Sequence, residues 1–483
     1  MLDLRRASPV VPVALALAAG LAGLGSKGFT SDEAVSVTLA RLPWHRFGDL
    51  IVHRETNGSL YFSALHLFTG GNGGEWAART PSVVFAAAAA FVFFLLLRRL
   101  FGAQVALVGG ALFALDPLQV EYSQTAREYV LAVLLVVLST YLFVRGVQEP
   151  SATVWAAYAL ASAAAAYAFL LAAALPAAHS LSLAALPRTR VPGRFVAFAL
   201  TGFAVLLVPL GVMLALTDAS GGVSWASGNL PGRVVVSLRG HFPRAVIVVL
   251  LVVLTAVLAA LWWRVVSRLP ASERAWPRVL VTAWLLVPSY LVTVAAFAWQ
   301  PLFILRYFLV FAPPLFAGLA ALLLRVRPAA AAAIVAAAAV GFAVGLAHWY
   351  SGAAGADYRG ASSYVSRAAK AGDGVLFYAP YVRIPFELYF RETRRSHEVR
   401  PVYPAVPWSR APARFIRFVP MPRSAISTAL APFRRIWLVL AQYRLYGQAD
   451  PGYDHILSAL RGRGFRLVQE RSYVGLVVRR YNR

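Results

Sequence analysis

Residues 79–97 read RTPSVVFAAAAAFVFFLLL, and the pair Arg98-Arg99 follows directly. An apolar run of about 20 residues is long enough to cross the hydrocarbon core of a bilayer as an α-helix. Comparable runs recur between residues 9 and 348 and then stop. The sequence therefore predicts a polytopic membrane part and a tail of different character. The predicted spans are 9–25, 79–97, 103–118, 129–147, 152–169, 171–187, 195–217, 243–263, 279–298, 307–324 and 329–348.

The composition agrees with this fold class. The chain has 483 residues, of which 59% are hydrophobic and 14% are charged, whereas soluble domains have about 45–50% apolar and about 25% charged residues. There is no Cys, which excludes disulfides, iron–sulfur clusters and thiolate metal sites. We predict a mostly α-helical protein, with a transmembrane bundle of about 11 spans over residues 1–349 and a small extracytoplasmic α/β domain over residues 350–483.

The basic residues predict the orientation. The chain has 46 Lys and Arg against 20 Asp and Glu, a net charge of +26. Arginines are found in every second loop between the predicted spans, a pattern typical of the cytoplasmic loops of membrane proteins. A protein that binds nucleic acid instead gathers its basic residues on one folded surface. Placing the N-terminus inside puts the tail outside the cytoplasm. An alternative for residues 1–25, a cleaved signal peptide, gives the same topology. The predicted cytoplasmic arginines are Arg5, Arg6, Arg98, Arg99, Arg145, Arg188, Arg190, Arg194, Arg264, Arg268, Arg274, Arg278, Arg325 and Arg327.

The tail and two outer loops have patterns of their own. Residues 34–42 and 60–68 predict helices along the membrane interface, and the Gly- and Ser-rich residues 218–242 predict a mobile loop. The tail has 22 basic and 8 acidic residues, a charge suited to anionic lipid headgroups or phosphates. Its hydrophobic pattern predicts helices at 359–371 and 453–460, strands at 374–378 and 435–440, and a hairpin of 465–470 with 473–478.

The first candidate site is Thr30-Ser31-Asp32-Glu33, just past the first predicted span. Adjacent carboxylates at a membrane boundary are costly to desolvate. Asp32 could act as a general base on an incoming hydroxyl. The alternative is structural, with Ser31 or Asp32 capping a helix that begins at Glu33.

The second candidate site is the outer turn over residues 116–129, which is dense in hydrogen-bonding groups. Arg127 can offer a planar, bidentate fork to a phosphate. Alternatively, Arg127 pairs with a neighbouring acid, Glu121 or Glu128, and stabilises the helix ends. Candidates for fixing a polar head group are Tyr122 and Gln124.

Other polar residues give weaker signals. Arg306, where a late span begins, either holds a lipid-borne phosphate or extends to the interface. Glu75 and Arg79 have the i,i+4 spacing of an exposed helical ion pair. His53 is interpreted as a surface histidine, because Asp32, Glu33 and His53 would specify a metal poorly. No cofactor is expected with certainty, and a divalent metal is left open.

Taken together and in this order, these segments resemble the large-loop polytopic glycosyltransferases of the GT-C type, particularly the bacterial membrane mannosyltransferase and aminoarabinose-transferase-like branch. The resemblance covers nearly all of residues 1–350. It rests on Asp32-Glu33, on Glu55 to Tyr61, on Glu75 to Ser82, on Tyr122 to Tyr129 and on Arg306-Tyr307. Many members have Pro-Pro where this chain has Gly58-Ser59, which leaves the shape of the acceptor groove open.

The resemblance implies transfer of a sugar from a polyprenyl phosphate outside the cytoplasm, with Asp32 as the catalytic residue and Glu33 as a supporting acid. It implies that Arg127 and Arg306 contact the lipid phosphate, and that the displacement inverts the anomeric carbon. The remaining candidates for substrate binding are Tyr122, Gln124, Asn57 and Tyr61.

The implied partners are a polyprenyl-phosphate-linked sugar donor, a glycan, lipid or protein acceptor, and the lipids of the cell membrane, with no nucleic acid. Two rival functions belong to other classes. One is a transporter or lipid flippase, which would need broken helices with polar residues at the bilayer midplane. The other is a non-catalytic protein that assembles envelope polymers.

Overall fold

The chain forms two compact units. The first consists of Met1–Ala22, Ile51–Ala64 and Arg79–Leu346, and the second of Gly23–Leu50, Leu65–Ala78 and Ala347–Arg483. The second unit therefore joins two outer-loop segments with the tail. The computed structural model describes residues 8–69, 73–187, 190–217, 244–268, 275–298, 305–352, 355–378, 382–391, 393–403, 405, 423–441, 444–445, 448–449 and 451–483.

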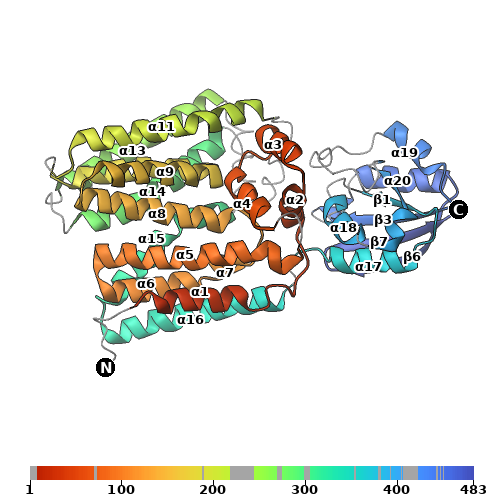
Figure 1. Cartoon of the computed structure of the whole chain (residues 1–483), viewed down its shortest axis with the longest axis horizontal. Coiled ribbons are helices and arrows are strands. Elements are labelled where there is room, and N and C mark those ends of the chain that lie inside the picture. The colour runs from red at the N-terminus through yellow and green to blue at the C-terminus, as the bar shows by residue number, and fades with distance from the viewer. Residues whose placement is uncertain are drawn as a thin grey trace. The chain divides into compact units, whose positions relative to one another are not determined.

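Helices that lie side by side make up the first unit (Figure 1). Packed pairs include α8 with α9, α9 with α11, α10 with α14, and α6 with both α1 and α15. The elements are α1 (Val10–Leu21), α5 (Glu75–Phe101), α6 (Ala103–Leu115), α7 (Pro117–Ser123), α8 (Tyr129–Gln148), α9 (Ala152–Ala168), η2 (Leu170–Ala174), α10 (Leu175–Ser182), η3 (Leu183–Ala185), α11 (Gly193–Leu216), α13 (Arg244–Arg268), α14 (Trp276–Ala298), η5 (Leu305–Phe311), α15 (Pro313–Leu323) and α16 (Pro328–Ser351).

Each of the eleven predicted spans overlaps one or more of these helices. Within the described residues, five helices are long and apolar enough to cross a membrane, or six if the bent pair α6–α7 forms one span. The other apolar helices meet this test only over shorter stretches, which in α13 is the stretch Leu251–Arg264, so the count of eleven stays a prediction. The range 103–118, predicted as one span, bends by 59° between α6 and α7. The break lies at Asp116-Pro117, because Pro has no N–H and restricts the residue before it.

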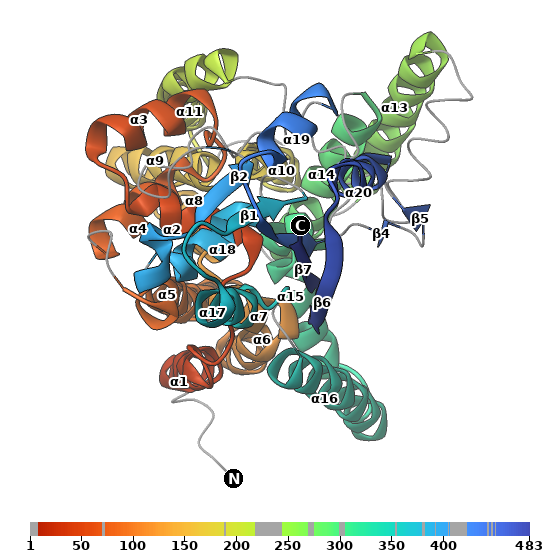
Figure 2. The same ribbon diagram turned by 90° about the vertical axis from the view of Figure 1, so that its right-hand side faces the viewer.

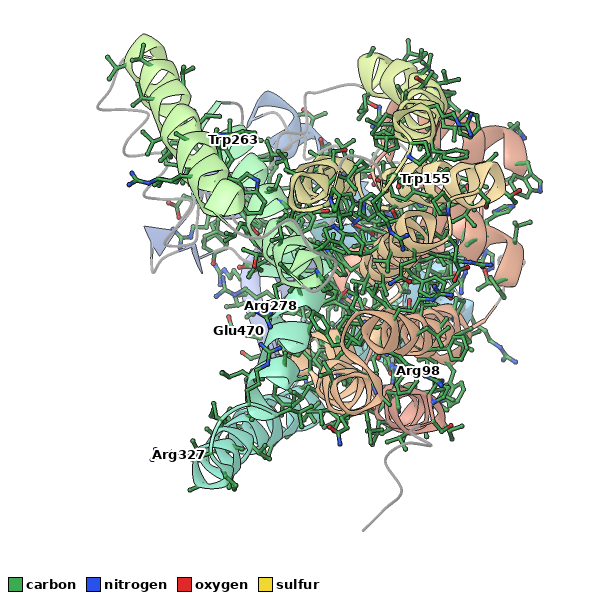
Figure 3. The ribbon with its side chains drawn as sticks, turned by 90° about the vertical axis from the view of Figure 1, so that its left-hand side faces the viewer. Arg98, Trp155, Trp263, Arg278, Arg327 and Glu470 are labelled. Atoms are coloured by element: carbon green, nitrogen blue, oxygen red, sulfur yellow. The ribbon has the colours of Figure 1, made fainter. Side chains whose placement is uncertain are left out.

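Two of the predicted cytoplasmic arginines, Arg99 and Arg145, lie together at one end of this bundle. Arg99, in the last turn of α5, donates to the side chain of Gln148 at 3.0 Å and pairs with Glu149 at 3.0 Å. Arg145 of α8 pairs with the same Glu149 at 3.4 Å. The ends of α5 and α8 therefore lie together, as the predicted orientation requires. Figure 3 views the bundle from this end and labels Arg98 of α5.

Outer-loop helices follow α1. They are α2 (Ser31–Ala40), α3 (Trp44–His53) and α4 (Ser59–Thr69). The interfacial helices predicted at 34–42 and 60–68 correspond to α2 and α4, whereas α3 was not predicted. The loop predicted at 218–242 lies outside the described residues.

A five-stranded sheet in the order β2-β1-β3-β7-β6 forms the core of the tail. Strand β1 runs parallel to β2 and β3, and β3 and β6 run antiparallel to β7. Its elements are α17 (Tyr358–Ala368), β1 (Gly374–Phe377), α18 (Arg383–Phe390), η7 (Arg394–His397), β2 (Arg400–Tyr403), α19 (Arg423–Leu430), β3 (Arg435–Ala441), β4 (Arg444–Leu445), β5 (Gln448–Ala449), α20 (Pro451–Gly462), β6 (Arg466–Tyr473) and β7 (Leu476–Asn482).

Both faces of this sheet are covered, which explains the continuous apolar run of β3. Trp437 and Val439 pack with α17 and α18, whereas Ile436 and Leu438 pack with α19 and α20. Figure 2 shows the two helix pairs on opposite sides of the sheet. The predicted helices and strands of the tail are therefore confirmed, and α18, β2 and α19 were missed.

Candidate functional site

The predicted site residues fall in both compact units. Asp32 and Glu33 belong to the second unit, whereas Asn57, Tyr61, Tyr122, Gln124, Arg127 and Arg306 belong to the first.

Asp32 lies in the first turn of α2 and is half-buried. Thr30 is the N-cap of this helix, because its hydroxyl accepts from the Glu33 amide at 3.2 Å while the Glu33 carboxylate accepts from the Thr30 amide at 3.0 Å. This reciprocal pair is a capping box. The alternative in which Ser31 or Asp32 caps a helix that begins at Glu33 is therefore wrong. The side chains of Thr30 and Glu33, and not that of Asp32, cap the N-terminus of α2. The helix dipole at this end favours a negatively charged carboxylate such as that of Asp32.

Glu33 has a structural role in this arrangement. Its side chain is only 1% exposed and completes the capping box. The predicted supporting acid therefore supports the helix that carries Asp32, and any direct contact with the substrate stays a prediction.

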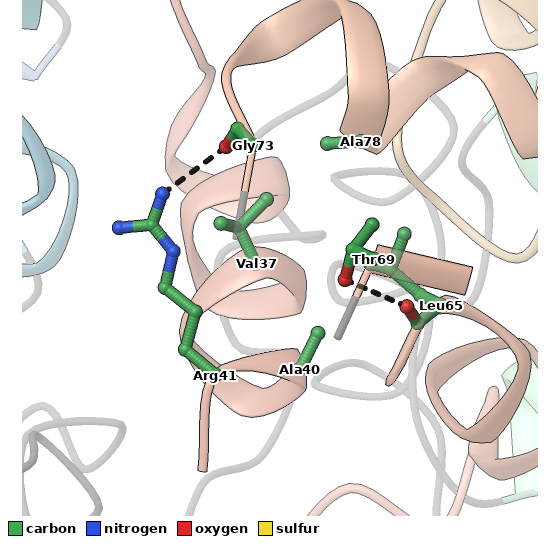
Figure 4. Close-up of a pocket in the computed structure, with 7 residues that line it drawn as sticks. All are labelled: Val37, Ala40, Arg41, Leu65, Thr69, Gly73 and Ala78. Atoms are coloured by element: carbon green, nitrogen blue, oxygen red, sulfur yellow. Dashed lines mark hydrogen bonds between the residues drawn. The ribbon is translucent and has the colours of Figure 1, made fainter. Parts of the chain in front are cut away.

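The second half of α2 borders a small cavity that is lined by residues of the second unit alone (Figure 4). Its volume is about 10 Å³, which is room for about one water molecule. Arg41 donates to the Gly73 carbonyl at 3.2 Å beside it. The cavity is too small for a sugar ring, so we do not assign a substrate to it. Its lining consists of Val37, Ala40, Arg41, Leu65, Thr69, Gly73 and Ala78.

Arg127 forms an ion pair with Glu128, as the structural alternative to phosphate binding predicted. Its Nε lies 2.9 Å from Oε2 of Glu128, and Nη2 donates to Oε1 at 3.1 Å. The Glu128 side chain is only 1% exposed. The guanidinium also lies 5.5 Å from the centre of the Phe62 ring. Arg127 is therefore held in place by the fold, whether or not it binds a phosphate.

Arg306 lies against aromatic rings from two elements. Its guanidinium carbon is 5.8 Å from the centre of the Tyr129 ring and 6.0 Å from that of Tyr307. Arg127 lies two positions before Tyr129 in the chain, next to the ring that Arg306 contacts. The structure thus brings together two arginines that are 179 positions apart in the sequence.

Aromatic rings connect the two arginine segments. The Tyr122 and Tyr129 ring centres are 4.9 Å apart, those of Tyr129 and Phe169 are 5.7 Å apart, and those of Phe169 and Tyr307 are 5.4 Å apart. Because cations bind favourably beside aromatic faces, this cluster can hold guanidinium groups in a fixed arrangement. Sequence reasoning included Tyr122 but missed the central Tyr129, although it lies within the quoted turn.

Two other predicted residues, Gln124 and Tyr61, make hydrogen bonds within the first unit. The Gln124 amide donates to the carbonyls of Ala19, Gly20 and Ala22 at 3.0, 3.0 and 2.7 Å, and so stabilises the end of α1. The buried Tyr61 hydroxyl lies 3.0 Å from that of Ser82. Their predicted contacts with substrate stay predictions.

Asn57 is an exposed residue before α4, and its Oδ1 accepts from the Leu170 amide at 2.9 Å. This bond ties the outer loop to the start of η2. A role for Asn57 in substrate binding likewise stays a prediction.

Gln119 of α7 was not predicted as a site residue. It is 3% exposed, and within the described part of the chain neither atom of its side-chain amide has a hydrogen-bond partner. A buried amide without a partner costs about 1–3 kcal/mol, so Gln119 is suited to bind a polar group. The only feature of the sequence that points to Gln119 is its position in the polar turn over residues 116–129.

The expected exposed pair of Glu75 with Arg79 is wrong. Arg79 is only 2% exposed. Glu75 forms an ion pair with Arg359 and accepts from the Tyr389 hydroxyl at 2.7 Å, contacts that lie within the second unit. His53 is exposed, as expected. Within the described ranges, no group of three or more His, Cys, Asp or Glu is arranged to hold a metal ion.

Comparison with known proteins shows which of them share this fold. Residues 59–214 match the family model described as dolichyl-phosphate-mannose-protein mannosyltransferase. The crystal structure of ArnT from Cupriavidus metallidurans bound to undecaprenyl phosphate superposes with a TM-score of 0.60 at 16% identity, over 98% of this chain and 97% of that chain. This is the fold of the GT-C glycosyltransferases.

The GT-C fold is also shared with a more distant structure. The oligosaccharyltransferase of Archaeoglobus fulgidus in complex with Zn and sulfate matches with a TM-score of 0.55 at 12% identity, over 97% of this chain and 73% of that chain. No curated protein sequence matches. The resemblance to GT-C polytopic membrane glycosyltransferases is thereby confirmed, and at these identities the structural matches establish the fold alone.

Proposed function

We propose that the chain is an integral-membrane glycosyltransferase that moves a sugar from a polyprenyl-phosphate donor to a hydroxyl of a cell-envelope acceptor on the extracytoplasmic face. The observation that carries the proposal is the near-complete match to the ArnT structure that contains undecaprenyl phosphate. The cluster of Arg127, Arg306 and Tyr129 supports it, because it offers positive charge for a lipid phosphate.

The chemistry follows from the donor. The acceptor oxygen attacks the anomeric carbon, and the bond from that carbon to the phosphate oxygen breaks with its electron pair staying on the polyprenyl phosphate. Asp32 takes the proton of the acceptor hydroxyl as general base. Arg306 and Arg127 stabilise the charge that develops on the phosphate. A direct displacement of this kind inverts the anomeric carbon.

We assign supporting roles to the remaining residues. Glu33 stabilises the start of α2, and Glu128 fixes the guanidinium of Arg127. Tyr122 packs against Tyr129 in the arginine cluster. Gln119 is proposed to bind a polar group of the donor, since its buried amide has no partner in the described chain. Asn57, Tyr61 and Gln124 hold the surrounding loops in place.

A panel of donors tests this function. Purified enzyme is incubated with polyprenyl phosphates that carry different hexoses and pentoses, and the release of free polyprenyl phosphate is measured by mass spectrometry. We expect release from at least one donor, and faster release when an envelope extract supplies acceptors. Absence of release from every donor, together with transport of the same lipids in proteoliposomes, would support the transporter instead.

The proposed localisation is the cell membrane, with residues 1–349 forming the membrane domain and residues 350–483 lying outside the cytoplasm. A reporter that is active only in the cytoplasm should give no signal when it is fused after Arg483, because eleven spans place that end outside. The same reporter fused after Arg99 should be active, since that end of α5 is proposed to be cytoplasmic. Strong signal from the Arg483 fusion would contradict the topology.

A further inference from the structure

The segment that leads into α2 is fixed by residues of the tail. Phe29 and Ser31 precede Asp32 by three residues and one residue, and each makes a hydrogen bond to a tyrosine that lies more than 300 positions later. All of these residues belong to the second compact unit.

Tyr389 of α18 makes the first of these contacts. Its hydroxyl oxygen accepts from the Phe29 amide at 2.8 Å and donates to Oε1 of Glu75 at 2.7 Å. Arg359 of α17 pairs with the same carboxylate. One hydroxyl thus links the backbone before Asp32, the start of α5 and the tail, and both of its hydrogen-bonding functions are used.

Tyr358 of α17 makes the second contact. Its hydroxyl lies 2.9 Å from Oγ of Ser31, the residue next to Asp32. Burial raises the pKa of Tyr358, the hydrogen bond to Ser31 opposes that rise, and the negative charge of Asp32 adds to it. Burial likewise raises the pKa of Tyr389, so both hydroxyls stay protonated at neutral pH.

Further contacts along the segment leave little room for it to shift. The ammonium of Lys27 donates to the Trp349 carbonyl and lies 3.5 Å from the centre of the Trp349 ring. A Cβ added at Gly28 would lie 3.4 Å from the Tyr389 hydroxyl. Residues 27 to 31 are therefore held at three points by residues of the second unit, namely Trp349 at the end of α16 and Tyr389 and Tyr358 of the tail.

We infer that Tyr358 and Tyr389 are positioning residues that hold the segment 27–31, and with it the carboxylate of Asp32, in the geometry required for proton removal. This inference rests on the proposed function, because it assigns a task to the tail in the same reaction. A general base must lie within hydrogen-bond reach of the proton that it accepts. A displacement of about 1 Å can cost about 10²-fold in rate.

The test compares Tyr358→Phe and Tyr389→Phe with the matched control Tyr364→Phe. Tyr364 also lies on α17, and its buried hydroxyl has no hydrogen-bond partner among the described residues. We expect each of the first two variants to lower kcat by about 10- to 100-fold while KM for the lipid donor stays within about twofold. The control should keep the kcat of the wild type. Because Tyr358 acts through Ser31, Ser31→Ala should add little to the loss caused by Tyr358→Phe.

Hydrogen exchange supplies a measurement that does not depend on turnover. Peptides covering residues 27–36 should exchange faster in Tyr358→Phe and Tyr389→Phe than in the wild type or in Tyr364→Phe. Unchanged exchange in both variants, or faster exchange with kcat like the wild type, would overturn the inference. If the wild type releases no polyprenyl phosphate from any donor, the proposed function fails, and the exchange result still shows whether the two tyrosines hold the segment.

Discussion

Asp32→Asn should lower turnover by about 10²–10⁴-fold, the usual contribution of a general base, while expression and thermal stability stay close to those of the wild type. Asn has nearly the same size but cannot accept the proton. The capping box of Thr30 and Glu33 leaves the helix start intact in this variant. Turnover by purified protein and thermal unfolding are measured on the same preparation.

The control for this variant is Asp49→Asn, the same substitution at an exposed position of α3 in the same unit. It should leave both turnover and stability unchanged. Turnover of Asp32→Asn within a few-fold of the wild type would contradict the catalytic assignment and favour the transporter. A loss of stability that accounts for the lost activity would return Asp32 to a structural role.

Arg306→Ala should weaken the use of the lipid donor more than Arg306→Lys does. A lost charge-assisted hydrogen bond costs about 1.5–3 kcal/mol, which corresponds to about 10- to 150-fold in kcat/KM. Lys keeps the charge but loses the planar fork that binds phosphate through two hydrogen bonds. The measurement is kcat/KM for the donor.

The control for Arg306 is Arg327→Ala, which removes an exposed arginine just before α16. It should have no effect on donor use. Donor use like the wild type in Arg306→Ala would show that Arg306 only packs against the rings of Tyr129 and Tyr307. Arg127→Ala is a less informative variant, because it leaves the buried Glu128 carboxylate without its ion pair, a change that strongly destabilises proteins.

Hydrophobicity predicted where the helices of the first unit lie, because each span needs its own apolar run whatever it packs against. The predicted ranges overlap helices throughout the described residues. Hydrophobicity alone did not predict the bend at Asp116-Pro117, because the predicted span 103–118 extended past it to Leu118.

In the tail, the sequence predicted strands such as β3, which is buried on both faces and therefore has a continuous run of apolar residues. Helix α18 was missed because Arg383 and Glu387 look like surface residues. In the structure they form a buried ion pair, with Nε 2.9 Å from Oε2. Charges that pair inside a domain give the sequence pattern of an exposed face, so their burial has to be seen in the structure.

The sequence could be used to propose candidate site residues, but it did not predict most of the contacts that these residues make. The sequence placed Asp32 and Glu33 together but did not predict the capping box, which depends on Thr30, three positions before the expected helix start at Glu33. The contact of Arg306 with Tyr129 joins segments that are far apart in the chain. No local pattern encodes such a contact. The same holds for the hydrogen bonds from Tyr358 and Tyr389, which come from the tail.

The central claim is that this chain transfers a sugar from a polyprenyl phosphate with Asp32 as base. Its most direct test is a time course of polyprenyl phosphate release and acceptor glycosylation, measured side by side for the wild type and Asp32→Asn with the best donor of the panel. The account predicts that the wild type forms the two products in equal amounts and that the variant forms almost none. Equal rates for the two proteins, or no glycosylated acceptor from the wild type, would contradict it.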